Sequence, residues 1–422
     1  MKDSLAATIE EKEEIKNIIL PVIYSYKEKR DKLFEEIDKE ELRDKLRKIK
    51  ENSINKIDEL KRQAIINLTN NGIKVFEAKD QQEAAKIIKG IVGNEKTIVK
   101  SKSNTANEIN LNEILKDKEI VETDLGDFVV QICEEQDVHP VLPALHLTPK
   151  KIAEVIKKRF GETVKPTPED ITIFVRNYLR NKIVNSKIGI TGANAITADG
   201  SIIILENEGN ISLVSRIPEK HIIISSFDKI VSSQEEALHI VKCSAIYGTG
   251  QNYPVYVNII SGPSKTSDIQ NQLVIGAQGA KEVYLILLDN GRTELLKSEF
   301  KELLYCINCG ACLNFCPVYH QITNRYGSKY FGARGVIFSL FSEGLKNSFD
   351  NGAFFCTTCQ SCKENCPAKI DLPNLIKNLR KKLTENGIEP ETITEMIKNI
   401  KEYGNPFGEI KEGKMPKELY CC

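Results

Sequence analysis

The chain has 422 residues and places eight of its twelve cysteines in two short windows, "CINCGACLNFCP" (306–317) and "CTTCQSCKENCP" (356–367). In each window three cysteines follow at intervals of three residues, and a fourth stands directly before a proline. Thiolates in such numbers are ligands for zinc or for iron–sulfur clusters. Zinc sites typically combine two cysteine pairs from separated hairpins, which these compact windows do not provide. The spacing therefore predicts iron–sulfur chemistry.

The closely spaced cysteines of one window can converge on a cluster only where the backbone loops around it. Gly310 and Ala311 supply small residues for such a loop in the first window. The windows resemble those of two-cluster ferredoxins, in which the fourth cysteine of each window binds the other cluster. This resemblance implies two 4Fe–4S clusters with crossed ligands. The first cluster takes Cys306, Cys309, Cys312 and Cys366, and the second takes Cys356, Cys359, Cys362 and Cys316.

The residues around the windows are predicted to be helical. The insert between the windows is longer than the link in a minimal ferredoxin, and its "GVIFSLF" stretch has apolar residues at helical spacing. Residues 296–385 are therefore predicted to form an all-α two-cluster ferredoxin-type domain, similar to the small subunits of succinate dehydrogenase and heterodisulfide reductase. Residues 386–422 are predicted to be a tail or linker. It ends in Cys421 and Cys422, which could supply ligands or a redox contact to a partner, or form an inert end.

Two further segments precede the windows. Residues 1–70 are dense in Lys and Glu with apolar residues at helical spacing, which predicts either a docking arm or exposed helices that cover the next domain. Residues 71–295 alternate short β-branched runs, such as "SIIILE" and "EVYLILL", with helix candidates, and "EIVETDLGDFVVQIC" (119–133) is counted among the strand runs. This alternation predicts a layered α/β domain with a largely parallel sheet.

The charge and the apolar runs of the sequence argue against several classes of protein. Lys+Arg and Asp+Glu both number 59, so the chain lacks the basic excess of a dedicated nucleic-acid binder. The start, "MKDSLAATIEEKEEIKN", is too charged for a secretory signal, and runs such as "VYLILL" are too short to span a membrane. These features predict a cytoplasmic protein with reduced cysteines. It could lie at a membrane surface only by binding a partner protein.

A series of phrases in the α/β region matches a known family. The phrases are "KSKSNTANEINLNEIL" (100–115), "GITGANAITADGSIIILENEGN" (189–210), "SGPSKTSDI" (261–269) and "VIGAQGAKEVYLILLDNGR" (274–292). Followed by two cysteine windows, this series resembles the iron–sulfur subunit of bacterial lactate-utilisation systems, the lactate utilisation protein B type. The resemblance covers roughly residues 60–390.

The resemblance implies a fold, a function and partners. Residues 71–295 would be a lactate-utilisation (LUD) domain, similar in fold to the ribose-5-phosphate isomerase and CoA-transferase group. The chain would be a non-catalytic component that relays electrons in a complex oxidising L-lactate to pyruvate. Its partners would be a cysteine-rich CCG-domain protein and either another LUD-domain protein or a dehydrogenase subunit.

The glycine-rich stretch "GITGANAITADGS" (189–201) is either a structural turn or the wall of a small-molecule pocket. It is not a G-x-G-x-x-G fingerprint, so dinucleotide binding is not supported. Two other functions stay open. One is an α/β enzyme of the isomerase or CoA-transferase type that uses Glu206 or Glu208, and the other is a relay subunit of a heterodisulfide-reductase-like or quinone-linked complex. The candidate pocket residues are Gly192, Asn194, Glu206 and Asn210.

Overall fold

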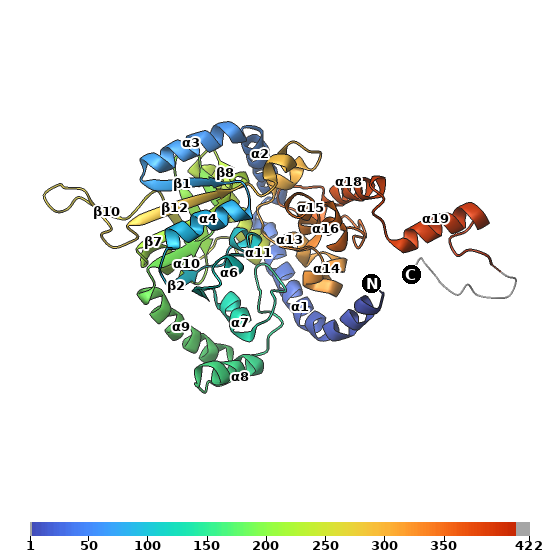
Figure 1. The fold of residues 1–422 in the computed structure, drawn as a ribbon, viewed down its shortest axis with the longest axis horizontal. Helices are drawn as coiled ribbons and strands as arrows, with labels where there is room; N and C mark the ends of the chain where they lie inside the picture. Colours follow the sequence, from blue (N-terminus) through green and yellow to red (C-terminus); the bar gives the residue numbers. More distant parts are fainter. Residues whose placement is uncertain (1, 411–422) are drawn as a thin grey trace.

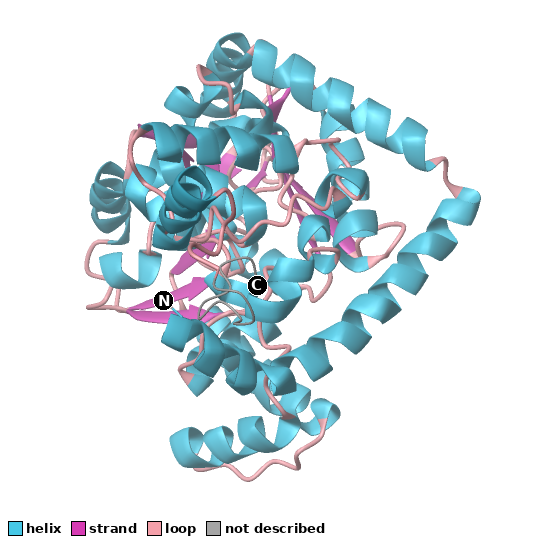
Figure 2. Ribbon diagram, turned by 90° about the vertical axis from the view of Figure 1, so that its right-hand side faces the viewer, coloured by secondary structure: helices cyan, strands magenta, loops and turns pink. Residues whose placement is uncertain are grey.

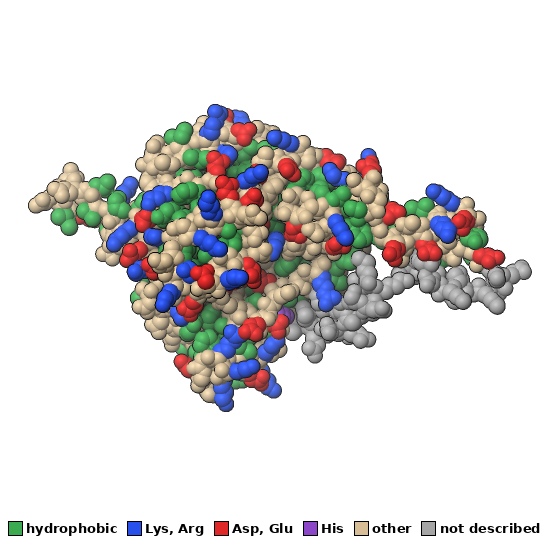
Figure 3. Space-filling model, viewed as in Figure 1, with side chains coloured by type: hydrophobic (Ala, Val, Ile, Leu, Met, Phe, Trp, Pro, Cys, Tyr) green, Lys and Arg blue, Asp and Glu red, His purple; other side chains and the backbone are tan. Residues whose placement is uncertain are grey.

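The computed structural model describes residues 2–410, so Cys421 and Cys422 lie outside the described residues. An α/β body and a helical region that carries the cysteine windows lie side by side (Figure 1). Helices surround the strands of the body (Figure 2). Basic and acidic side chains are mixed over the face seen in Figure 3, in line with the balanced charge of the sequence. None of the helices in residues 2–410 is both long and apolar enough to cross a membrane.

A six-stranded sheet forms the centre of the α/β body, and every neighbouring pair of its strands is parallel. Its central strands are buried almost throughout, as expected for a parallel sheet covered by helices on both faces. The predicted α/β class with a parallel sheet is confirmed. The strand order is β1 (Ile73–Ala78), β12 (Glu282–Leu288), β7 (Lys220–Ser226), β4 (Ile188–Thr191), β2 (Thr97–Lys100) and β3 (Glu119–Glu122).

A second, four-stranded mixed sheet follows the order β8 (Ile230–Val231), β5 (Ala195–Thr197), β6 (Ile202–Glu206) and β9 (Tyr256–Ile260). A hairpin of β10 (Lys265–Thr266) and β11 (Val274–Ile275) projects from the body (Figure 1). The body's helices are α4 (Gln81–Val92), α5 (Asn104–Glu108), α6 (Leu111–Ile114), α7 (Leu125–Cys133), α8 (Pro149–Phe160), α9 (Pro168–Asn185), α10 (Asn210–Arg216) and α11 (Gln234–Thr249). A threonine cap followed by proline begins both α8 and α9.

The windows lie in a region of short helices, together with an isolated bridge between Gly327 and Phe331. The elements are α12 (Arg292–Leu296), the 3-10 turn η2 (Lys301–Tyr305), α13 (Ala311–Asn314), α14 (Pro317–Ile322), the 3-10 turn η3 (Thr323–Arg325), α15 (Gly332–Ser342), α16 (Leu345–Asp350), α17 (Ser361–Glu364) and α18 (Leu372–Glu385).

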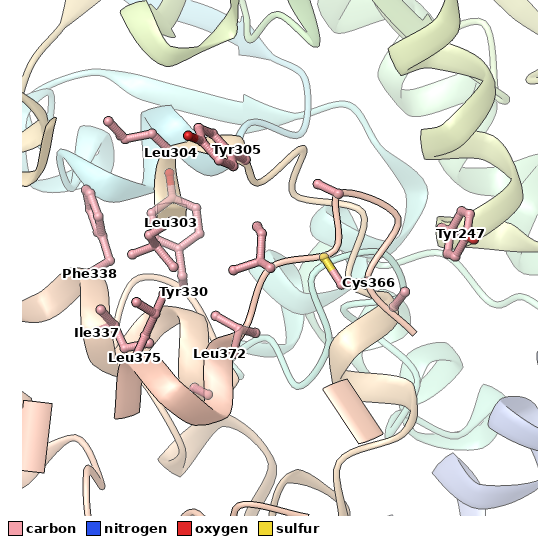
Figure 4. Close-up of a cluster of buried hydrophobic side chains, with 14 of the residues drawn as sticks. Tyr247, Leu303, Leu304, Tyr305, Tyr330, Ile337, Phe338, Cys366, Leu372 and Leu375 are labelled. Atoms are coloured by element: carbon pink, nitrogen blue, oxygen red, sulfur yellow. The ribbon is translucent and has the colours of Figure 1, made fainter. Parts of the chain in front are cut away.

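One hydrophobic core joins the two regions. It combines side chains of α11 with side chains of η2, α15 and α18. Figure 4 shows part of this core, with Tyr247 coming from α11 and Cys366 from the second window. The N-terminal helices α1 (Lys2–Glu36) and α2 (Lys39–Asn55) lie against it, and α3 (Ile57–Asn70) packs on β1. The windows are therefore held against the α/β body by shared packing.

One expectation about local structure is wrong, and the predicted tail contains a helix. The run 119–133 is strand only over Glu119–Glu122, and then becomes helix α7, because the Asp124 carboxylate accepts hydrogen bonds from the N–H groups of Gly126 and Asp127 and caps a helix there. The tail predicted over 386–422 contains helix α19 (Glu391–Tyr403), which stands away from the body in Figure 1.

Candidate metal centre

The two cysteine windows have the same backbone conformation. Asn308 and Gly310 of the first window have φ of 58° and 79°, and Thr358 and Gln360 at the matching places have φ of 52° and 70°. These left-handed residues turn the chain around its own cysteines, and a one-turn helix follows each time. Because both loops bend in the same way, each can present three sulfur atoms to a common point.

Backbone N–H groups point at cysteine sulfurs in both windows. The N–H of Asn308 lies 3.4 Å from Cys306 Sγ, and the N–H of Thr358 lies 3.4 Å from Cys356 Sγ. The Tyr319 N–H lies 3.5 Å from Cys316 Sγ. Hydrogen bonds of this kind stabilise thiolate ligands and tune cluster potentials.

The eight cysteines surround two small cavities. One is lined by Cys306, Cys309, Cys312 and Cys366, which come from both windows. The other is lined by Cys316, Cys356, Cys359 and Cys362, again from both windows, and Cys312 lines this cavity as well as the first. Within residues 2–410, no three His, Cys, Asp or Glu side chains are grouped closely enough to hold a single metal ion.

Burial raises the pKa of two thiols of the second window. Burial, reinforced by the charge of Cys316, Cys356 and Cys359, raises the pKa of Cys362 to about 12. Burial also raises the pKa of Cys366 to about 12, with the charge of Cys306 adding to the effect. Such buried thiols release their protons only when a cation takes the place of the proton, so metal binding and deprotonation are coupled here. The donor set fits iron–sulfur clusters.

Basic side chains from distant elements brace the second window. Arg43 of α2 donates through Nε to the carbonyl of Cys366 at 3.1 Å. Arg30 of α1 donates to the Asn365 side chain at 2.9 Å and lies 4.6 Å from the ring centre of Phe315. Arg380 of α18 donates to the carbonyls of Ala353 and Cys356. The loop therefore depends on α1, α2 and α18 for its position.

A larger cavity of about 320 Å³ lies between the α/β body and the first window. Gly192, Asn194, Glu206 and Asn210 all line it, and its far wall is formed by Cys306 to Cys309. The sequence predicts these four residues as candidates for one pocket, and the structure brings them together. The sequence does not predict, however, that this pocket borders a cysteine window.

Comparison with known proteins identifies the family. The model of the "LUD domain" matches residues 61–288, and that of the "4Fe-4S dicluster domain" matches residues 302–370. The chain belongs to the LUD-domain family. Its LUD domain is followed by a 4Fe-4S dicluster domain, as the resemblance in the sequence implies.

Several curated relatives match most of this chain. "Lactate utilization protein B" of Bacillus subtilis is 35% identical over 353 residues, covering 82% of this chain and 72% of that protein. The protein of the same name from Lysinibacillus sphaericus is 36% identical over 356 residues, covering 83% and 73%. The "uncharacterized electron transport protein YkgF" of Escherichia coli is 32% identical over 382 residues, covering 89% and 78%. A solved structure of a DUF162 family protein from Deinococcus radiodurans is similar only at a TM-score of 0.29 and 15% identity, over 55% of this chain and 98% of that one.

Most of the predicted pocket residues of the LUD domain also have structural partners. Glu206 accepts hydrogen bonds from Ser212 and from Asn258 Nδ2 at 2.7 Å. The Asn194 Oδ1 accepts from the Leu205 N–H at 3.0 Å, and Asn210 donates to Thr123 at 3.2 Å. A Cβ atom at Gly192 would lie 2.7 Å from the Ser103 Oγ, so any larger residue there would force Ser103 to move. Glu206 is therefore engaged within the LUD domain, which argues against its use as a free catalytic base.

Sequence reasoning does not find Arg334, which lies beside the first group of cysteines. Arg334 of α15 lines cavities together with Cys306 and Cys312, and only 8% of its surface is exposed. Its Nε and Nη1 atoms have no hydrogen-bond partner in the part of the chain that the structure describes. Nothing in "GARGVIF" marks this arginine, because its neighbours come from segments far away in the sequence.

Proposed function

We propose that the chain is an iron–sulfur electron-transfer subunit in a complex that oxidises L-lactate, or another 2-hydroxy acid, to the 2-oxo acid. The observation that carries this proposal is the pair of matching cysteine loops around two neighbouring cavities, with Cys312 lining both. The names of the relatives, lactate utilization protein B and an electron transport protein, support it.

The proposed ligand sets are crossed between the windows. The first cluster is held by Cys306, Cys309, Cys312 and Cys366, and the second by Cys356, Cys359, Cys362 and Cys316. The way these cysteines line two separate cavities supports the assignment. When bound, such clusters accept and pass on single electrons. The chain's own part is to supply the thiolates, donate N–H groups to their sulfurs, and exclude water with the surrounding core.

An electron relay needs a donor and an acceptor. We propose, as the family resemblance implies, a CCG-domain protein and a second LUD-domain protein or dehydrogenase subunit as partners, in the cytoplasm. We also propose that the LUD domain is related in fold to the ribose-5-phosphate isomerase and CoA-transferase group. A relay role in a heterodisulfide-reductase-like or quinone-linked complex would use the same windows and differ in its electron donor.

Anaerobic purification with iron and sulfide analysis tests the relay itself. We expect about eight irons per chain, four for each of two clusters. An iron content well below this value would overturn the two-cluster proposal. Co-purification of the native complex then tests the substrate. Electron paramagnetic resonance (EPR) should show cluster reduction by L-lactate, and clusters that dithionite reduces and L-lactate does not would favour the other relay complexes.

A further inference from the structure

The cavity between the LUD domain and the first window has two lysines at one end. Lys50 is buried, and its Nζ donates to the backbone carbonyl of Asp228. The Nζ of Lys229 donates to the carbonyl of Ala193 at 2.7 Å and lies 3.4 Å from the Thr105 hydroxyl. Both side chains line the cavity. All of these acceptors are uncharged, so hydrogen bonds satisfy the lysines without neutralising them.

The carboxylates nearest to these lysines are already paired with an arginine. Arg292 binds Asp228 through Nε at 2.8 Å and Glu108 through Nη2 at 2.7 Å. A buried ammonium group is costly unless an anion pairs with it. Burial lowers the pKa of both lysines, so each holds its proton most readily when an anion lies beside it. Because the nearest carboxylates are paired with Arg292, this end of the cavity favours an anion.

The rest of the cavity lining is of a different kind. Asp124 and Glu208 line another part of it, where Lys102 pairs with Asp124 at 3.1 Å. The buried Ser244 hydroxyl also lines the cavity and has no hydrogen-bond partner in the described part of the chain. Carboxylates and a free hydroxyl favour a ligand that carries hydrogen-bond donors away from its anionic end.

The size and position of the cavity limit what it can bind. Its volume of about 320 Å³ suits a metabolite and not a macromolecule. Residues 306–309 form one wall, so a bound molecule would contact the loop that carries two of the proposed ligands of the first cluster.

We propose that this cavity binds a small hydroxy-acid anion, with its carboxylate at Lys229 and Lys50 and its hydroxyl toward the acidic side. The identity of the acid rests on the proposed function, whereas the anion site rests on the lysines and the cavity alone. The LUD domain would then present a small molecule directly to the first window.

Calorimetric titration of the full-length chain, purified anaerobically with its clusters, tests the site. We expect saturable binding of L-lactate to the unmodified chain. Lys229→Met should weaken it by about tenfold or more, the loss expected for one charge-assisted hydrogen bond. Lys220→Met is the matched control, because Lys220 also donates to a carbonyl, that of Ile91 at 3.1 Å, but lies at the opposite end of β7. We expect it to bind as the unmodified chain does.

Several outcomes would overturn the proposal. They are absence of L-lactate binding, equal binding by the Lys229→Met chain, and binding of inorganic phosphate in place of L-lactate. Ser244→Ala serves as a second variant if Lys229→Met does not fold, and should also weaken binding. Iron content and dithionite-reduced EPR spectra of the same samples separate this test from the relay proposal. A chain with full iron content that does not bind L-lactate would overturn the site alone, and a chain that binds L-lactate without clusters would overturn the relay alone.

Discussion

The guanidinium carbon of Arg334 lies 3.3 Å from the centre of the Tyr330 ring. The Tyr330 hydroxyl donates to Glu108 at 2.7 Å, and Glu108 is bound by Arg292. Tyr330 thus fixes the Arg334 guanidinium through its ring, while the nearby carboxylate is neutralised by another arginine. Arg334 is left as a buried positive charge beside the first group of cysteines.

A positive charge near a cluster stabilises the reduced form, which is the more negative one. We expect Arg334→Met to lower the midpoint potential of the first cluster by roughly 50–100 mV and to leave the second nearly unchanged. An anaerobic redox titration followed by EPR measures both potentials. Arg334→Lys retains the positive charge, so the midpoint potential of the first cluster should stay close to that of the unmodified chain. An equal change in the midpoint potentials of both clusters would show that the substitution disturbs the structure as a whole, and that the charge of Arg334 does not act on the first cluster alone.

The crossed ligand assignment has a direct test. Cys316→Ser should remove or alter the cluster whose other ligands are Cys356, Cys359 and Cys362, and should spare the other cluster. Iron analysis and EPR should show loss of about half of the signal and metal. Cys366→Ser should have the reverse effect. Loss of the first cluster in the Cys316→Ser chain would refute the crossing.

Gln360 occupies a left-handed backbone position that Gly310 fills in the first window. A non-glycine residue is strained there, so Gln360→Gly should stabilise the chain by about 0.5–1 kcal/mol. The thermal unfolding midpoint of the cluster-loaded protein, followed by circular dichroism, measures the effect. Gln360→Ala keeps the steric penalty and should give no increase. A similar gain for alanine and glycine would assign the effect to loss of the glutamine side chain.

Burial lowers the pKa of Lys229 to about 8, against opposing effects of the charges of Asp228 and Glu108, while Arg292 and Arg334 lower it further. Only the protonated ammonium binds an anion, so L-lactate affinity should be full below this pKa and fall as the pH rises through about 8. Calorimetric titrations between pH 6.5 and 9 would show this decline. Affinity that is constant over this range would remove Lys229 from the site.

The sequence predicts those features that depend on local spacing. The cysteine windows and the pocket turn around Gly192 are of this kind, because their residues are close in the chain. Lys229 and Arg334 could not be found, since their importance comes from neighbours such as Ala193 and Tyr330 that the fold places beside them. Helix α7 was missed for another reason: an apolar run of this length suits a strand or a helix, and the Asp124 cap decides between them.

The bracing of the second window by α1 and α2 bears on how the chain is made. Arg30 and its partner Asn365 are 335 residues apart, and Arg43 lies 323 residues before Cys366. During synthesis the N-terminal segment leaves the ribosome first, long before the carbonyls and amides that it will hold. The contacts of Arg30 and Arg43 with the second window can therefore form only after that window has been translated, whereas α1 and α2 can pack on α11 before then.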